Sequence, residues 1–220
     1  MDDLKKLDIE DLVVLYKEPE VADARGCPIF LLIHGWTGDE RSMWIFTNRL
    51  PKTALIIAPR AIYSSKIGGY SWTTDPTKRW PSTDDFDQAI AALNRFITKD
   101  CFPMADFSRL NLIGFSQGAA LAFSYLVSLP NKVHSLAGLS GFLPANLQGN
   151  IQPGLLEGKK IFLAHGTKDE RVPIELARQD VGTLEKCGAK VTYCEDNVGH
   201  KLSASCFRAM DAFFAGQAGC

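Results

Sequence analysis

The apolar residues of this chain form short segments of two kinds that alternate along its length. Segments of the first kind are aliphatic or β-branched and end at Gly, Pro or a polar turn: Leu12–Tyr16, Ile29–Ile33, Ala54–Ala58, Leu110–Ile113, Val133–Leu139, Lys160–Ala164 and Val191–Glu195. Several are apolar throughout, which is typical of strands buried on both faces. Segments of the second kind have helical patterns: Phe86–Ile97, Ala119–Leu129, Pro173–Cys187 and Lys201–Phe214. This alternation predicts an α/β fold, with a mostly parallel central sheet and helices on both faces.

Length and composition fit one globular domain. The chain has 220 residues, of which 46% are apolar and 22% charged, and no linker or repeat divides it, so we expect a single domain over residues 1–220. The formal net charge of −1 leaves no basic excess for nucleic-acid binding. The first residues lack the apolar stretch of a secretory signal, and no apolar run near a terminus approaches the roughly 20 residues that span a bilayer. We therefore expect a cytoplasmic protein without membrane insertion.

Cysteine spacing argues against disulfides and against a metal site. The chain has six cysteines, at positions 27, 101, 187, 194, 206 and 220. They form no CxxC pair, and most lie within apolar patterns, so we expect buried free thiols. The histidines at positions 34, 134, 165 and 200 show no ligand-type spacing with the cysteines. We expect neither a metal nor another cofactor.

The sharpest local signal is the G-x-S-x-G pattern of Gly114–Gly118, which lies between a predicted buried strand and a predicted helix. A nucleophilic serine at a tight strand-to-helix turn needs small neighbours, and here Gly114, Gly118 and Ala119 are all small. The helix that begins at this point directs backbone N–H groups toward any oxyanion formed there. Although a plain Gly-Ser turn would have the same composition, this context favours Ser116 as a nucleophile.

A serine nucleophile needs a base and an acid that orients the base. His200 follows a late strand and is the only histidine after a plausible acid loop, whereas the other histidines are adequately explained as structural. The acid should lie in the turn after Lys160–His165, where Asp169 and Glu170 are both candidates. Glu170 also fits a solvated surface charge. The backbone N–H groups of Trp36 and Gln117 are the expected oxyanion donors.

Five segments together resemble the phospholipase/carboxylesterase family of α/β-hydrolases, which includes bacterial carboxylesterases and acyl-protein thioesterases. They are His34–Asp39, Gly114–Gly118, Ser140–Pro144, His165–Glu170 and Gly199–His200. The resemblance implies Ser116 as nucleophile, Asp169 as acid, His200 as base, and Trp36 and Gln117 as oxyanion donors. Thr37 stands where many members have glycine, and Ala119 replaces a second glycine. Homodimers occur among similar proteins, so a homodimer is also possible.

The resemblance leads us to expect a serine carboxylesterase that acts on small-molecule esters with short- to medium-chain acyl groups. An acyl-thioesterase or a lysophospholipase would use the same residues, and a protein of another class, a non-catalytic ligand-binding protein, could have the same fold. Residues 140–159 are too short and too rich in Pro and Gly for a helical cap domain. The walls of an open acyl pocket are then expected from Trp72, Phe142, Leu143 and Val172.

Overall fold

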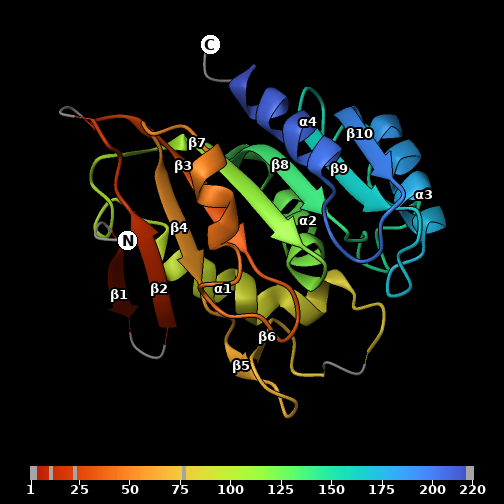
Figure 1. Cartoon of the computed structure of the whole chain (residues 1–220), viewed down its shortest axis with the longest axis horizontal. Helices are drawn as coiled ribbons and strands as arrows, with labels where there is room; N and C mark the ends of the chain where they lie inside the picture. Colours follow the sequence, from red (N-terminus) through yellow and green to blue (C-terminus); the bar gives the residue numbers. More distant parts are fainter. Residues whose placement is uncertain (1–3, 10–11, 22–23, 76–77, 217–220) are drawn as a thin grey trace.

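The computed structural model describes residues 4–9, 12–21, 24–75 and 78–216. Its main sheet has the spatial order β1-β2-β4-β3-β7-β8-β9-β10 (Figure 1). These strands are β1 (Lys5–Ile9), β2 (Leu12–Lys17), β3 (Cys27–Ile33), β4 (Leu55–Pro59), β7 (Ala105–Phe115), β8 (Val133–Leu139), β9 (Lys160–Gly166) and β10 (Lys190–Asp196). β2 pairs antiparallel with both β1 and β4, whereas the pairings from β4 to β10 are all parallel. The predicted mostly parallel sheet is therefore confirmed.

Helices cover both faces of this sheet. They are η1 (Trp44–Arg49), η2 (Thr83–Phe86), α1 (Asp87–Phe96), α2 (Gln117–Ser128), η3 (Pro130–Lys132), α3 (Ile174–Lys186) and α4 (Ala204–Ala215). One apolar core contains Leu93 of α1, Phe123 of α2 and Leu184 of α3. A second core contains Phe46 of η1 and Met210 of α4. Figure 1 shows α4 crossing in front of the sheet and α2 behind it.

The alternation of side chains in β3 explains why this segment is apolar throughout. Ile29, Leu31 and Ile33 belong to the core on the α1–α3 side. Phe30 and Leu32, which alternate with them, belong to the core on the η1–α4 side. Because successive strand residues point to opposite faces, a central strand covered on both faces has no polar positions.

Two long segments that connect strands and helices, residues 60–81 and residues 140–159, differ in structure. Residues 60–81 contain a small hairpin of β5 (Tyr63–Ser64) and β6 (Tyr70–Ser71), which projects beyond the carboxyl end of β4 (Figure 1). Residues 140–159 form turns and contain no helix. The fold therefore lacks a cap inserted at this position, as predicted.

The cysteines correct one prediction. Cys194 of β10 and Cys206 of α4 form a disulfide, with their Cα atoms 5.6 Å apart. Cys27, Cys101 and Cys187 are free, and Cys220 lies outside the described residues. The prediction of free thiols was wrong for the bonded pair because sequence spacing does not reveal that α4 packs back against β10.

Candidate active site

Ser116 lies in a sharp turn between β7 and α2. Its backbone angles are φ 53° and ψ −117°, a combination that residues other than glycine rarely adopt. The flanking glycines make the turn possible. A Cβ at Gly114 would lie 2.4 Å from the carbonyl oxygen of Gly118, and a Cβ at Gly118 would lie 2.2 Å from that of Ile33. The local sequence thus produces a strained turn that places Ser116 at the start of the helix.

Asp169 and His200 come from the loops that follow β9 and β10, and the structure brings them together. The Nδ1 atom of His200 lies 2.7 Å from Oδ2 of Asp169. Oδ1 of Asp169 accepts hydrogen bonds from the backbone N–H groups of Arg171 and Val172, each at 2.9 Å. The Asp169 side chain is fully buried, whereas that of His200 is 14% exposed. An ionised carboxylate can only accept, so Nδ1 carries the proton and Nε2 keeps its lone pair.

The competing residues occupy positions that suit structural roles. Glu170 is exposed to solvent. His34 is buried, accepts a hydrogen bond from the N–H of Ala61 through Nε2 and contacts the carbonyl of Gly35 through Nδ1. His165 is also buried, and its Nε2 donates to the carbonyl of Val172. Burial lowers the pKa of both imidazoles.

The two expected oxyanion donors border one cavity with the reactive side chains. Trp36, Gln117, Ser116 and His200 all line a cavity of about 610 Å³. Gln117 is the first residue of α2, where backbone N–H groups have no acceptor inside the helix. Within the described part of the chain, neither the Trp36 nor the Gln117 backbone N–H has a hydrogen-bond acceptor. Both groups are therefore available to a ligand.

The side chain of Gln117 has a role that sequence analysis missed. Its Oε1 accepts a hydrogen bond from the backbone N–H of Trp72, at 3.0 Å. Its Nε2 donates to the hydroxyls of Ser71 and Thr73, at 3.2 and 3.1 Å. These bonds tie the start of α2 to the end of β6 and the residues that follow it. The sequence held one signal for this role: Gln117 is a polar residue directly after the expected nucleophile, at the start of a helix that packs on the sheet.

Trp72 is not a wall of the cavity, contrary to the prediction. Its side chain is 1% exposed, and its indole N–H donates to the carbonyl of His34 at 2.7 Å. The indole ring also lies against the His34 ring, with 5.0 Å between centroids. Trp72 therefore supports the turn at residues 34–38 from inside the protein, where a ligand cannot reach it.

The other three predicted wall residues divide in the same way. Phe142 and Val172 line the cavity. Leu143 is fully buried in the core on the α1–α3 side and does not line it, so this prediction is also wrong. Neighbouring residues of a loop can point in different directions, and here Phe142, although buried, faces the cavity whereas Leu143 points into the core. Trp80 completes this wall, because it lines the cavity and makes an edge-to-face contact with Phe142, with centroids 4.9 Å apart.

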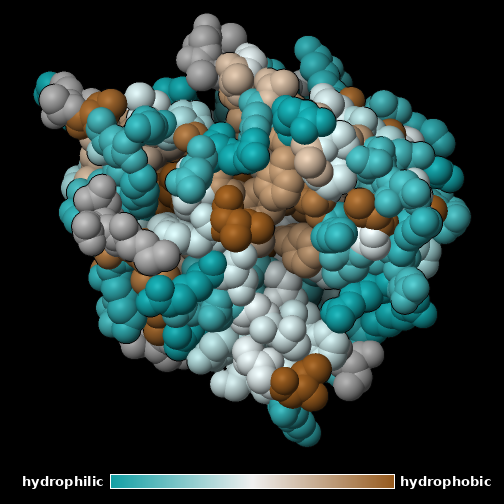
Figure 2. Space-filling view, viewed as in Figure 1, coloured by the Kyte–Doolittle hydropathy of each residue, from teal (hydrophilic) through white to brown (hydrophobic). Residues whose placement is uncertain are grey.

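A second, largely apolar cavity of about 350 Å³ adjoins the first. The two share Gly35, Trp36, Thr37 and Phe115. The remaining lining residues come from the turn after β3, from η1 and from the region at the start of α4: Gly38, Ser42, Met43, Ile45, Phe46, Lys201, Leu202 and Phe207. Figure 2 shows apolar side chains gathered in the centre of the face on which α4 lies. The surface beside Ser116 therefore offers apolar contact on two sides.

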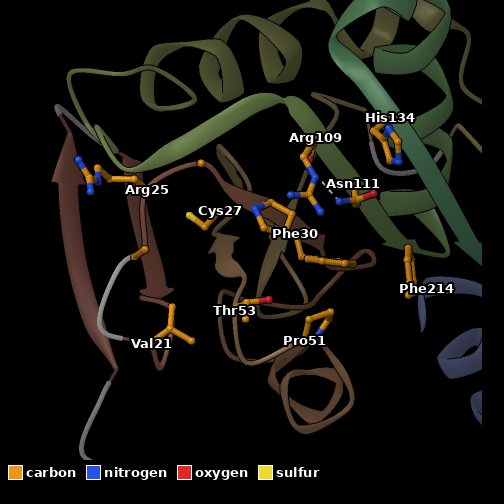
Figure 3. Close-up of a pocket in the computed structure, with 13 residues that line it drawn as sticks. Val21, Arg25, Cys27, Phe30, Pro51, Thr53, Arg109, Asn111, His134 and Phe214 are labelled. Atoms are coloured by element: carbon orange, nitrogen blue, oxygen red, sulfur yellow. Dashed lines mark hydrogen bonds between the residues drawn. The ribbon is translucent and has the colours of Figure 1, made fainter. Parts of the chain in front are cut away.

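A third cavity, of about 330 Å³, lies at the opposite end of the sheet (Figure 3). The residues that line it include Arg109 and Asn111 of β7, His134 of β8 and Phe214 of α4, and none of the predicted catalytic residues.

Among the described residues, no group of three or more His, Cys, Asp or Glu side chains could hold a metal ion. The described helices are all too short or too polar to cross a membrane.

Comparisons with known proteins show the family to which the chain belongs. The family model described as Phospholipase/Carboxylesterase matches residues 20–216. A segment of 104 residues is 32% identical to acyl-protein thioesterase 1 of Saccharomyces cerevisiae and covers 46% of this chain but only 45% of the yeast protein.

Solved structures of similar shape extend over most of the chain. The carboxylesterase of Bacillus cereus aligns with a TM-score of 0.78 at 20% identity, over 94% of this chain and 95% of that one. The carboxylesterase of Mesorhizobium loti aligns with a TM-score of 0.81 at 19% identity, over 98% of this chain and all of that one. Because the family model extends over nearly the whole chain and the fold agrees with it, the chain belongs to the phospholipase/carboxylesterase family of α/β-hydrolases.

Proposed function

We propose that the protein is a serine carboxylesterase that cleaves small-molecule esters through an acyl-enzyme intermediate. The observation that carries this proposal is the 2.7 Å contact between His200 Nδ1 and Asp169 Oδ2, beside a cavity that Ser116 also lines. A protein that only binds ligands has no need for a buried carboxylate aligned with an imidazole next to a strained serine. The geometry therefore favours catalysis over simple binding.

The reaction follows from the positions of these groups. Nε2 of His200 takes the proton of the Ser116 hydroxyl as its oxygen attacks the ester carbonyl. The backbone N–H groups of Trp36 and Gln117 stabilise the oxyanion, and buried Asp169 stabilises the imidazolium. The imidazolium then protonates the leaving alcohol. Water, activated by His200, hydrolyses the acyl-enzyme and restores Ser116.

The cavity suggests the range of acyl groups. Its walls include Trp80, Phe142 and Val172, and no helix in residues 140–159 covers it. Each methylene that fits against such walls contributes up to about 0.8 kcal/mol. The kcat/KM should therefore rise with acyl length until the acyl chain fills the cavity. Aryl esters from acetate to palmitate, tested above and below the micellar threshold, measure this range. Strong preference for palmitate with interfacial activation would contradict an open cleft.

The partial similarity to acyl-protein thioesterase 1 favours thioesters as an alternative substrate class. A lysophospholipid is a further possibility, since its acyl ester could be cleaved by the same groups. Turnover of an ester and a thioester that carry the same acyl chain separates the first two, and a short-chain lysophospholipid tests the third.

The decisive experiment compares the wild-type protein with Ser116→Ala. We expect a fluorophosphonate probe to label the wild type and not the variant, and turnover of a butyrate ester to fall by a factor of roughly 10⁴ or more. Ser128→Ala, at the exposed other end of α2, is the matched control and should retain both. If a folded Ser116→Ala variant kept near-normal turnover, the assignment of the nucleophile would be wrong.

A further inference from the structure

The cavity beside Ser116 has an unbalanced set of charges at its rim. Three of its lining residues are cationic, namely Lys78, Arg79 and Arg171. In the part of the chain that the structure describes, the cavity lining includes no Asp or Glu. Lys78 is neutralised by an ion pair with Asp85. Within the described residues, Arg79 and Arg171 form no ion pair through their side chains. Two arginines without an ion-pair partner among the described residues therefore line the cavity that Ser116 also lines.

Both arginines are anchored to parts of the site. The guanidinium carbon of Arg79 lies 5.1 Å from the centre of the Trp80 ring, and Trp80 contacts Phe142 in the cavity wall. The backbone N–H of Arg171 donates to Asp169, which in turn holds His200. The Arg79 guanidinium is thus held against the cavity wall, whereas Arg171 is fixed to the acid loop through its backbone. The contact with Trp80 reduces the conformational entropy that ordering the Arg79 side chain on a ligand would cost.

The surroundings strengthen the effect of these two charges. Trp80, Phe142 and Val172 give the cavity low-dielectric walls, and a cleft lined by charge of one sign attracts ligands of the opposite sign. A planar guanidinium matches the two oxygens of a carboxylate or the oxygens of a phosphate. A neutral ester gains nothing from either group, whereas an anionic ester gains from both.

We propose that the site prefers esters that carry a carboxylate or phosphate near the scissile bond, and that Arg79 and Arg171 determine this preference. The inference rests on the proposed esterase function and deepens it, since it names the substrate class. It concerns soluble anionic esters, in which the charged group occupies the rim while Ser116 attacks the carbonyl.

The test uses two matched pairs of substrates. In the first pair the charge is on the acyl side: the 4-nitrophenyl monoester of glutarate against the neutral 4-nitrophenyl 5-oxohexanoate. In the second it is on the leaving group: 4-(butanoyloxy)benzoate against 4-(butanoyloxy)benzamide. The rate of the Ser116→Ala protein is subtracted throughout. For each pair, the ratio of kcat/KM for the anionic ester to that for the neutral ester is compared between proteins, so that intrinsic reactivity cancels.

We expect this ratio to fall about twofold to fivefold in each of Arg79→Gln and Arg171→Gln, and about tenfold in the double variant, for at least one pair. Arg208→Gln removes an exposed charge of α4 that does not line the cavity and should keep the ratio. In the wild type, raising salt from about 0.05 M to about 0.5 M should lower kcat/KM only for the anionic ester.

The two proposals fail in different ways. If the wild type hydrolyses both members of each pair, but the arginine variants and salt leave the ratios unchanged, the charge inference is wrong and the esterase function stands. If the wild type hydrolyses none of the four esters and the fluorophosphonate does not label it, the esterase function itself is wrong. Because the salt dependence uses only wild-type protein, it tests whether positive charge at the rim attracts the anionic ester even if an arginine variant does not fold.

Discussion

The carboxyl group of Asp180 is buried in α3 under the loop that contributes Phe142 to the cavity. It is 4% exposed, and one of its oxygens accepts the backbone N–H of Leu143 at 2.8 Å. Removal from water raises its pKa from the ordinary 3.8 to about 7, against the opposing effect of the Leu143 hydrogen bond. The ionised form is therefore less stable in the folded protein than in the unfolded chain.

This difference gives a stability change with a defined sign. Because the pKa is raised in the folded state, the folded protein binds the proton more tightly than the unfolded chain does. The penalty is absent below about pH 4, grows as pH rises from about 4 to about 7, and is constant above. A shift of about 3 units corresponds to about 4 kcal/mol, which is an upper limit for what the charge costs.

Replacing Asp180 with Asn removes the charge and keeps an oxygen that can accept the Leu143 N–H. We expect Asp180→Asn to be more stable than the wild type by up to about 4 kcal/mol at pH 8, with a difference that approaches zero near pH 4. Urea unfolding across this range, at constant ionic strength, measures it. Glu175→Gln, an exposed carboxyl on the same helix, is the control. A pH-independent difference, or a less stable variant at pH 8, would refute the reasoning.

Three further predictions concern the turns around the cavity. Thr37 has φ 67°, which is strained for a β-branched residue, so Thr37→Gly should raise the unfolding free energy by about 1 kcal/mol in urea titrations; a less stable variant would contradict this. Asp169→Asn should lower kcat by a factor of about 10⁴ and Glu170→Gln hardly at all, and the reverse order would move the acid to Glu170. Replacing both Cys194 and Cys206 with Ala removes the disulfide that closes a loop with a sequence separation of 12. This should lower the free energy of unfolding by about 3 kcal/mol in thermal or urea unfolding, because the disulfide constrains the unfolded chain; equal stability would contradict that explanation.

The order of elements and the main chemical groups could be predicted because they depend on local sequence. A strand covered on both faces must be apolar throughout, so Ile29–Ile33 was recognisable as a central strand. A tight strand-to-helix turn excludes a Cβ at Gly114 and Gly118, so the pattern around Ser116 indicated both the turn and its place in the fold. Chain order then pointed to His200 and to the turn that contains Asp169, although it did not choose between Asp169 and Glu170 from spacing alone.

Only the tertiary structure decided the contacts and directions of side chains whose surroundings come from segments distant in the sequence. Cys194 and Cys206 meet because α4 packs back against β10, and no spacing rule reveals such a contact. Trp72 and Phe142 are both aromatic residues in loops, yet the first is enclosed behind the turn at residues 34–38 and the second faces the cavity. Arg79 and Arg171 line the same cavity although they are 92 positions apart in the sequence. Hydrophobicity and periodicity determine which segments are buried, but the direction of a loop side chain depends on the packing of every element around it.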